Sequence, residues 1–478
     1  MNTQPSRQTK IVATLGPASD GLIPQLVSAG VDVFRCNFSH GTHAEHEARI
    51  RRIREAAQQQ ERFVAVLGDL QGPKIRITGF SGGRPVVLQN DAAFAIDTAH
   101  AADAGTGDIV GTTYKPLPAE VMAGDVLVLG DGLVELEVQG TQGTRVDCRV
   151  RLGGKVASNQ GINKRGGGLS APALTDKDHY DLAFACGQGV DYLAVSFPRA
   201  AQDIEQAREL IEAQGAGCRV IAKLERVEAV RGGTLDEIIL AADGVMVARG
   251  DLGIEIGDAR LVGVQKRIIE RARELNRPVI TATQMMESMI NNPRATRAEV
   301  MDVANAVIDG TDAVMLSGET AVGDFPLQTV QSMVRIVVGA ESVPNLETGL
   351  NAEVPCETID QAVALAAMTV AERLDGVRAV ACLTASGNTP RLMSRIRSRL
   401  PIYALGDSPR TLGRVALYRG VHPVRFETAA LDYDKVNAAT LERLLTLGAV
   451  AQGDRIILSK GDFHNVQGGT NTLKIVDI

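Results

Sequence analysis

Polar side chains that could bind an anion gather at the end of one apolar run. Residues 33–41 read VFRCNFSHG, and strand side chains alternate, so Arg35, Asn37 and Ser39 are expected on one face. A single polar residue there would fit a solvated strand end. Three are harder to explain in that way, because an unpaired guanidinium is costly to bury. The pattern favours Arg35 as an anion ligand, with His40 just beyond it.

A second charged group contains Lys223 and Glu225, two positions apart in VIAKLE and therefore on one strand face. Alone, the pair could equally be a simple ion pair at a strand end. The next apolar run ends in VARGDLG, which places Asp251 beside Glu225. Neighbouring carboxylates repel unless a cation lies between them, and oxygen ligands favour Mg²⁺ or Mn²⁺. Gly250 adds bare backbone that can hold a carboxylate or phosphate.

Hydroxyl residues complete the candidate site. Thr283 ends an inward-facing series in RPVITATQMMESM, and Gln284 is expected to begin a helix. A threonine in a strand is usually only a good strand former, so Thr283 is selected by its place beside the carboxylates. Ser317 follows the last apolar run, and Thr320 is interpreted as a helix N-cap. A metal, a lysine, an arginine and a hydroxyl can together stabilise a transferring phosphoryl group and a neighbouring enolate.

These residues stand at the ends of β-branched runs that alternate with amphipathic segments. Helical spacing follows the runs, for example at 203–214 and 264–276. Repeated βα units with polar strand ends predict a TIM (β/α)8 barrel, an α/β fold. A doubly wound open sheet is the alternative, but no GxGxxG opens the first unit. The eight runs lie at 11–16, 31–37, 63–69, 190–197, 218–225, 243–250, 277–284 and 311–318.

Two stretches depart from the barrel pattern. Residues 74–168 are rich in Gly and contain two alternating runs joined around Asp131-Gly132, which predicts an inserted all-β lid domain over the active-site end. After the barrel, strand and helix alternate again over 341–478, which predicts a separate α/β domain. The catalytic barrel would comprise 1–73 and 169–340.

Composition excludes several classes of function. The chain has 478 residues, more than one ordinary domain, and its net charge of −7 argues against nucleic-acid or anionic-membrane binding. Its six cysteines include no CxxC pair, which favours reduced thiols. The polar N-terminus and the lack of a long apolar span predict a soluble, cytoplasmic protein without a membrane segment.

An ordered set of segments resembles the pyruvate kinase signatures over essentially the whole chain. The segments are KIVATLGPAS, RCNFSHG, LGDLQGPKIR, AKLE, VMVARGDLG, ATQMMESM and MLSGET. The resemblance implies a phosphotransferase of glycolysis, which transfers the phosphoryl group of phosphoenolpyruvate to ADP and yields pyruvate and ATP. It also implies a barrel with a lid, a C-terminal effector domain and a homotetramer.

The resemblance further implies roles, position by position. Glu225 and Asp251 would hold the catalytic Mg²⁺ or Mn²⁺, and Lys223 would contact the phosphoryl group in transit. The amides of Gly250 and Asp251, with Thr283, would bind the substrate carboxylate. The other roles fall on Arg35 for the phosphoryl group, on Thr283 and Ser317 for proton delivery through water, and on Asn37, His40 and Arg76 for the nucleotide.

Two positions depart from the family pattern. Lys74 replaces a glutamate and resembles the potassium-independent branch, so K⁺ is predicted not to be required. Gln160 replaces a lid lysine, and the lost nucleotide-phosphate contact would fall to Lys155, Lys164 or Arg165. The monovalent-cation positions of the family correspond here to Asn37, Ser39, Asp69 and Leu70.

A phosphate cradle is predicted in the C-terminal domain. Thr384–Thr389 reads TASGNT, follows a strand and opens a helix, with Arg391 nearby. An ordinary N-cap is the alternative, because Ser, Thr and Asn are preferred there. The loop at 461–472 contains no Lys or Arg and one acid, Asp462, so a sugar monophosphate is expected as activator in preference to a bisphosphate. The predicted cradle residues are Thr384, Ser386, Gly387, Asn388 and Thr389.

Two rival functions use the same residues differently. A metal-dependent phosphoenolpyruvate or pyruvate lyase or aldolase would share the Glu225–Asp251 pair but would need neither lid nor ADP. A catalytically inactive, effector-sensing scaffold is the other rival, and the intact Lys223 and Thr283 count against it. ADP-dependent release of pyruvate separates all three.

Overall fold

A closed barrel of parallel strands forms the centre of the computed structural model, which describes residues 7–130, 132–343, 356–428, 431, 433–462 and 468–478. The order around the barrel is β1-β16-β15-β14-β13-β12-β3-β2. The eight runs predicted as barrel strands are confirmed. They are β1 (Lys10–Thr14), β2 (Val33–Asn37), β3 (Ala65–Asp69), β12 (Tyr192–Val195), β13 (Arg219–Leu224), β14 (Gly244–Ala248), β15 (Val279–Ala282) and β16 (Ala313–Leu316).

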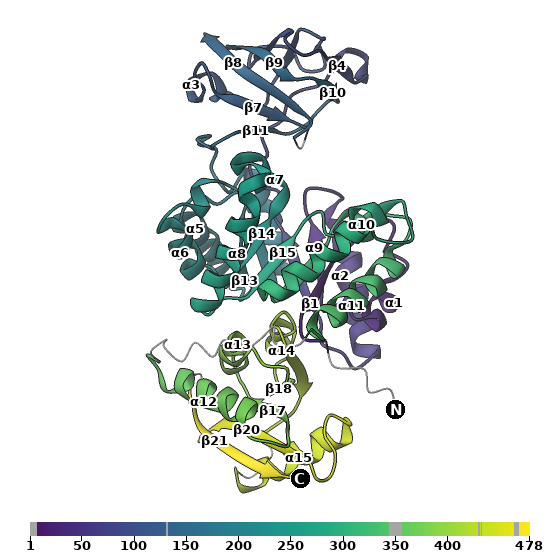
Figure 1. Ribbon diagram of the computed structural model, residues 1–478, viewed down its shortest axis with the longest axis vertical. Coiled ribbons are helices and arrows are strands. Elements are labelled where there is room, and N and C mark those ends of the chain that lie inside the picture. Colours follow the sequence, from purple (N-terminus) through teal and green to yellow (C-terminus); the bar gives the residue numbers. More distant parts are fainter. Residues whose placement is uncertain (1–6, 131, 344–355, 429–430, 432, 463–467) are drawn as a thin grey trace.

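Helices follow the strands and cover the outside of the barrel (Figure 1). The helix predicted from Val264 begins earlier, at Asp258, because Gly257 with φ +84° separates it from the helix before. The helices are α1 (Ile23–Ala29), α2 (His43–Gln59), α4 (Asp176–Gly187), α5 (Ala201–Ala213), α6 (Thr234–Ala241), α7 (Arg249–Ile256), α8 (Asp258–Glu274), α9 (Arg297–Asp309), α10 (Gly318–Ala321) and α11 (Pro326–Glu341), with 3-10 turns at Glu228–Val230 and Glu287–Ile290. In the described part of the chain, no helix is both long and apolar enough to cross a bilayer.

The barrel interior is apolar near the amino ends of the strands and polar at their carboxyl ends. Val33 and Ile221 belong to a buried apolar cluster inside the barrel. Because side chains alternate, Arg35 and Lys223 also point inward, one step nearer the carboxyl ends. Arg35 and Lys223 therefore lie on the inner face of the barrel, as strand alternation in the sequence predicts.

The inserted all-β lid lies beyond one end of the barrel (Figure 1). Its β7 and β8 pair as the predicted antiparallel hairpin, although Asp131 lies outside the described residues. The sheet orders are β10-β4 and β11-β7-β8-β9-β5-β6. The elements are β4 (Val86–Leu88), β5 (Ala93–Asp97), β6 (Ile109–Gly111), α3 (Leu117–Glu120), β7 (Val126–Leu129), β8 (Val134–Gln142), β9 (Arg145–Leu152), β10 (Gly154–Val156) and β11 (Ile162–Lys164), with a 3-10 turn at Ser81–Gly83.

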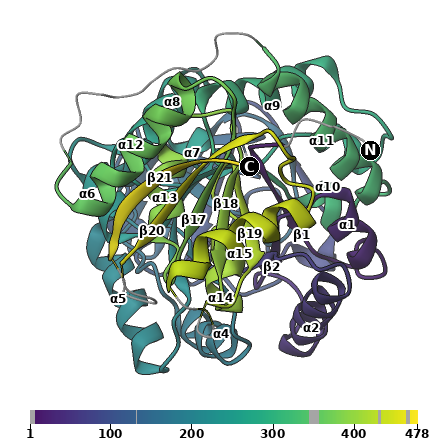
Figure 2. The same cartoon turned by 90° about the horizontal axis from the view of Figure 1, so that it is seen from below.

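The C-terminal α/β domain packs below the opposite end of the barrel, as Figure 2 shows from that side. Its sheet has the order β19-β18-β17-β20-β21, and only the pairing of β20 with β21 is antiparallel. The elements are α12 (Ile359–Arg373), β17 (Val377–Leu383), α13 (Asn388–Arg395), β18 (Ile402–Gly406), α14 (Pro409–Val415), β19 (Val421–Arg425), α15 (Tyr433–Thr446), β20 (Arg455–Gly461) and β21 (Thr470–Asp477).

This domain shares its apolar core with the barrel. The cluster inside the barrel continues through Met393 and Val421 of the C-terminal domain. Polar contacts cross the same boundary: Arg395 Nη1 donates to Asp312 Oδ2 at 2.6 Å, and Lys10 Nζ donates to the Val421 carbonyl at 2.6 Å. Both side chains of the Arg395–Asp312 pair are almost completely buried. The barrel floor and the C-terminal domain are therefore one packed body.

Candidate active site

A buried network of charges lies at the carboxyl ends of β2, β3 and β13. Arg35 Nε donates to Asp69 Oδ2 at 2.5 Å, and Arg35 Nη1 donates to Thr14 Oγ1 at 3.0 Å. Lys223 Nζ lies 3.3 Å from Asp69 Oδ1 and 2.9 Å from Glu225 Oε1. The simple ion pair considered for Lys223 and Glu225 therefore exists, but as part of a network in which both cations share Asp69.

Hydrogen bonds fix the members of this network. Lys223 Nζ donates to Ser196 Oγ at 2.7 Å, and Ser196 Oγ donates to the Leu70 carbonyl at 2.7 Å. The second carboxylate oxygen of Glu225 accepts from the Phe197 amide at 2.8 Å. The ammonium of Lys223 thus has a fixed position at the mouth of the barrel.

The network sets the protonation states of its members. Burial would raise the pKa of Asp69, but the charges of Arg35 and Lys223 and their hydrogen bonds hold that pKa below its usual value. Burial would lower the pKa of Lys223, yet Asp69 and Glu225 outweigh it and raise that pKa. Lys223 therefore remains charged at neutral pH, although it is removed from water.

The two carboxylates proposed as metal ligands differ in burial, with side chains 3% exposed at Glu225 and 20% exposed at Asp251. Burial raises the pKa of Glu225 above its usual value, Asp251 adds to this rise, and Lys223 only partly opposes it. Asp251 is more open, with Lys74 Nζ 3.8 Å from its Oδ1. No group of three or more His, Cys, Asp or Glu side chains that could hold a metal occurs among the described residues. A two-carboxylate site fits Mg²⁺, which completes its shell with water and substrate oxygens.

Thr283 stands at a strained corner next to these carboxylates. The amide of Gly250 donates to Thr283 Oγ1 at 2.9 Å, so the two meet at one point. Thr283 and Gln284 have φ values of +68° and +53°, in the left-handed region that residues other than glycine rarely adopt. Arg249 Nη2 holds the bend by donating to the Thr283 carbonyl at 2.6 Å. The expectation that Gln284 begins a helix is wrong, because this left-handed bend intervenes before the 3-10 turn at Glu287–Ile290.

Ser317 lies at the end of β16 with a buried hydroxyl that makes no hydrogen bond to any described residue. The N-cap interpretation of Thr320 is wrong. Thr320 lies inside α10, and its Oγ1 donates to the Thr14 carbonyl at 2.8 Å, which ties the helix to β1. The N-cap position itself is occupied by Ser317, whose side chain accepts no capping bond.

The residues assigned to the nucleotide and to a monovalent cation lie at or just after the carboxyl ends of β2 and β3 and in the connection to the lid. Asn37 Oδ1 accepts from the Ser39 amide at 3.1 Å, and the side chain of His40 is exposed just beyond. Arg76 lies in the lid connection and donates from Nη1 to the Asn159 carbonyl at 2.9 Å. Lys74 forms an ion pair with Asp251, with its Nζ 3.8 Å from Asp251 Oδ1.

Comparisons with known proteins agree over the whole chain. Residues 6–330 match the model of the pyruvate kinase barrel domain, and residues 361–476 match that of the pyruvate kinase alpha/beta domain. The chain belongs to the pyruvate kinase family. It is therefore a phosphotransferase of glycolysis that acts on phosphoenolpyruvate and ADP.

Three curated relatives illustrate the breadth of the match. Pyruvate kinase II of Salmonella typhimurium is 50% identical over 99% of both chains. A pyruvate kinase of Haemophilus influenzae is 48% identical over 98% of this chain and 97% of its own. A pyruvate kinase of Corynebacterium glutamicum is 42% identical over 98% of this chain and 97% of its own. The match covers 97–99% of each of these three relatives.

The lid of this pyruvate kinase family member holds two of its three candidate phosphate contacts in ion pairs. Lys164 Nζ lies 2.8 Å from Asp125 Oδ2, and Arg165 Nη2 lies 2.7 Å from Glu135 Oε1. Lys155 on β10 is exposed.

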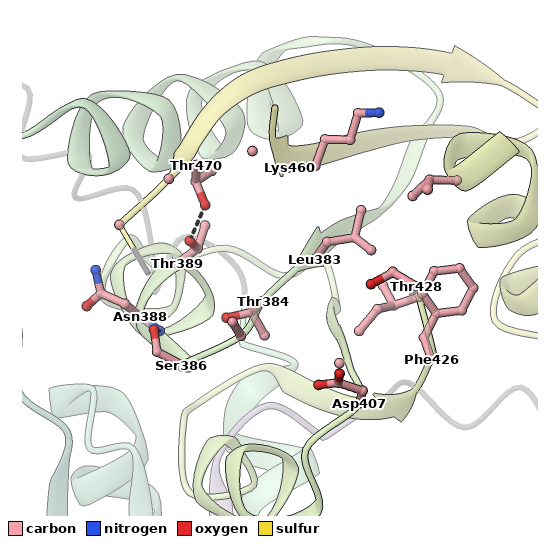
Figure 3. A pocket seen from close by; sticks show the side chains of 17 residues that line it. Leu383, Thr384, Ser386, Asn388, Thr389, Asp407, Phe426, Thr428, Lys460 and Thr470 are labelled. Carbon is pink, nitrogen blue, oxygen red and sulfur yellow. Dashed lines mark hydrogen bonds between the residues drawn. The ribbon is translucent and has the colours of Figure 1, made fainter. Parts of the chain in front are cut away.

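The predicted cradle in the C-terminal domain opens into a pocket between β17, β18 and β20 (Figure 3). Thr384 Oγ1 accepts from the Gly387 amide at 2.9 Å, and Gly387 has φ +84°. Thr389 Oγ1 lies 2.7 Å from Thr470 Oγ1. Thr384, Ser386, Asn388 and Thr389 line one end of the pocket, whereas Gly387 does not line it.

The charged residues that line this pocket are not the one predicted from the last loop, Asp462. Asp462 does not line the pocket and accepts from Asn471 Nδ2 at 2.7 Å. Asp407 and Lys460 are the charged residues among the described lining residues. Part of the last loop, 463–467 with His464, lies outside the described residues.

Sequence reasoning missed three residues of these sites. Asp69 was considered only as a monovalent-cation position, yet it pairs with both cations of the active site. Ser196 is the penultimate residue of the run 190–197 and has the inward parity of Tyr192 and Ala194, so strand alternation could have identified it. Lys460 precedes the loop that was searched for cations, and only the sheet order brings it to the pocket.

Proposed function

We propose that this pyruvate kinase binds Mg²⁺ or Mn²⁺ between Glu225 and Asp251 and transfers the phosphoryl group past Lys223. The observation that carries the proposal is the Lys223 ammonium, held 2.9 Å from Glu225 and 3.3 Å from Asp69 at the barrel mouth. A cation fixed in that place needs no reorganisation when negative charge develops in front of it.

The bound metal would supply charge neutralisation for the phosphoryl oxygens and for the enolate. Arg35, fixed by Asp69 and Thr14, binds the phosphoryl group of phosphoenolpyruvate. Lys223 stabilises the charge that the phosphoryl group spreads during transfer to the β-phosphate of ADP. Both side chains are already held in place by buried hydrogen-bond partners.

The backbone at Gly250 and Asp251, with Thr283, is proposed to hold the substrate carboxylate. The existing bond from the Gly250 amide to Thr283 Oγ1 supports this role, because it brings a donor and a hydroxyl to one point. Thr283 and Ser317 would orient, through water, the proton that reaches the enolate carbon. The unpartnered buried hydroxyl of Ser317 is consistent with a water-bridged role.

The nucleotide is proposed to lie between barrel and lid, against Asn37, His40 and Arg76. The ammonium of Lys74 is proposed to provide positive charge in place of K⁺. Its distance of 3.8 Å from Asp251 Oδ1 places that charge beside the proposed metal site. With Lys74 in that role, the residues at the family's monovalent-cation positions, Asn37, Ser39, Asp69 and Leu70, would not need to bind K⁺.

A sugar monophosphate is the proposed activator, bound at Thr384–Thr389. Hydroxyls line one end of the pocket, and its charged lining residues are one cation, Lys460, which favours a phosphate, and one carboxylate, Asp407, which disfavours a second phosphate. Activation would lower the half-saturating phosphoenolpyruvate concentration, with coupling of about 1–3 kcal/mol. A homotetramer, as the family resemblance implies, is part of this proposal.

A steady-state assay tests the proposal directly. Pyruvate release from phosphoenolpyruvate should require both ADP and a divalent metal, and should rise with glucose 6-phosphate or ribose 5-phosphate at low phosphoenolpyruvate. Pyruvate release without ADP would favour the lyase or aldolase alternative. Binding of sugar phosphates without turnover would favour the scaffold.

A further inference from the structure

The chain leaves the lid through three consecutive glycines that pass against the end of β13. Gly166, Gly167 and Gly168 have φ values of +84°, +78° and +97°. A Cβ at Gly167 would lie 2.3 Å from Val227 Cγ1 and 2.5 Å from Glu228 Oε1. The glycines therefore permit both the turn and a close approach of backbone to barrel.

Buried or backbone groups of the barrel make three of the hydrogen bonds that hold this lid exit. The Gly168 amide donates to Glu228 Oε1 at 2.5 Å, and Arg226 Nη2 donates to the Leu169 carbonyl at 2.7 Å. The Gly166 amide donates to the carbonyl of Glu255 at 2.9 Å. Backbone atoms in one short segment are thus held from two different parts of the barrel, the residues that follow β13 and helix α7.

The side chains that hold the lid exit also contact one another. Arg226 Nε lies 3.5 Å from Glu228 Oε2 and 3.6 Å from Glu255 Oε1. Glu255 Oε2 accepts from the Val227 amide at 2.8 Å. Arg226 and Glu255 are each only 4% exposed. Removal of the arginine would leave buried carboxylate without its cation, so the cluster depends strongly on it.

Arg226 and Glu255 each stand close in sequence to a proposed metal ligand. Arg226 directly follows Glu225, and Glu255 lies about one helical turn after Asp251 on α7. We propose that Arg226, Glu228 and Glu255 form a lid latch, with Arg226 as its positioning residue. The latch fixes the lid exit relative to the two proposed metal ligands, Glu225 and Asp251. The inference rests on the proposed placement of ADP between lid and barrel.

The latch should affect the two substrates unequally. Phosphoenolpyruvate is assigned to groups of the barrel, whereas ADP is assigned partly to Arg76 in the lid connection. Loosening the lid exit therefore moves one wall of the ADP site and leaves the phosphoenolpyruvate site in place. Misplacement of a binding wall by about 1 Å can cost up to about 100-fold in rate.

The decisive variant is Arg226→Ala, with Arg231→Ala as its matched control. Arg231 also donates to this segment, from Nη2 to the Gly166 carbonyl at 3.3 Å, but it is exposed and outside the latch. Arg226→Ala should lower kcat/KM for ADP about 10- to 100-fold, while KM for phosphoenolpyruvate changes less than about threefold. Arg231→Ala should stay close to wild type in both.

A second pair of variants keeps the test valid if Arg226→Ala folds poorly. Glu228→Ala should show the same split between substrates, whereas Glu228→Gln, which retains an acceptor for the Gly168 amide, should recover most of the ADP efficiency. Amide exchange of residues 162–169 should accelerate in both alanine variants of the latch. Equal losses for ADP and phosphoenolpyruvate, or unchanged exchange, would overturn the latch. Failure of the wild type to require ADP would instead refute the proposed function.

Discussion

The active site and the C-terminal pocket are both proposed to bind phosphate, yet they are built from different groups. The active site uses buried ions that hold one another, with Arg35 and Lys223 sharing Asp69. The C-terminal cradle uses hydroxyls and backbone, such as Thr384 Oγ1 accepting from the Gly387 amide. Charge that develops during a reaction is stabilised by ions fixed in advance, whereas a resting phosphate can be held mainly by hydroxyl and amide donors with one cation, such as Lys460, nearby.

The strongest test of this contrast removes charge from the active site. Glu225→Gln or Asp251→Asn should lower turnover at saturating Mg²⁺ about 10³-fold or more, or about 4 kcal/mol of transition-state stabilisation. Each substitution keeps nearly the same shape but loses the negative charge that attracts the metal. Initial rates over a range of Mg²⁺ concentrations measure the effect. Near-normal turnover in either variant would contradict the metal assignment.

A second test separates phosphoryl transfer from metal binding. Lys223→Met should lose most turnover, because the ammonium meets charge developing in transit, but it should still bind Mn²⁺ and phosphoenolpyruvate. Mn²⁺ titration of the variant, beside Glu225→Gln as a positive control for metal loss, gives the comparison. A loss of Mn²⁺ affinity as large as in the Glu225 variant would make Lys223 a residue of site assembly.

Removal of potassium should change turnover less than the two substitutions above. With Lys74 present, turnover in potassium-free buffer should be close to maximal, because its ammonium already supplies the charge. Lys74→Glu should become at least partly dependent on K⁺. Rates with and without KCl, at constant ionic strength, provide the measurement. Strong activation of the wild type by K⁺ would show that Lys74 does not fill this role.

The smallest expected effect belongs to the C-terminal pocket. The double variant Thr384→Ala/Ser386→Ala should abolish activation by glucose 6-phosphate or ribose 5-phosphate and leave basal turnover intact, since no reacting charge is involved. Half-saturating phosphoenolpyruvate, with and without effector, reports the coupling. The prediction is contradicted if fructose 1,6-bisphosphate activates the wild type more strongly, or if the double variant still responds to the monophosphates.

Alternation along strands explains how much of the active site could be predicted from sequence. Arg35, Lys223 and their apolar neighbours follow a period of two, so their inward direction was predictable. The bend at Thr283 was not, because a positive φ at two successive side-chain-bearing residues depends on tertiary contacts such as the one from Arg249. The distances that join Asp69 to both cations depend likewise on barrel closure.

The C-terminal pocket was less predictable for a related reason. The TASGNT cradle is local in sequence, and its turn at Gly387 follows from short-range hydrogen bonds. The charges opposite it come from β18 and β20, which the sheet order brings beside β17. A search limited to the last loop could therefore identify Asp462 but not Asp407 or Lys460.

The apolar cluster shared by barrel and C-terminal domain has a consequence for how the molecule melts. Met393 and Val421 complete the core that begins with Val33 and Ile221, so neither part can lose its structure without exposing the other. Heating should therefore produce one calorimetric transition for these two parts, not two. A chain shortened to end at residue 343 should expose this apolar floor and aggregate during expression.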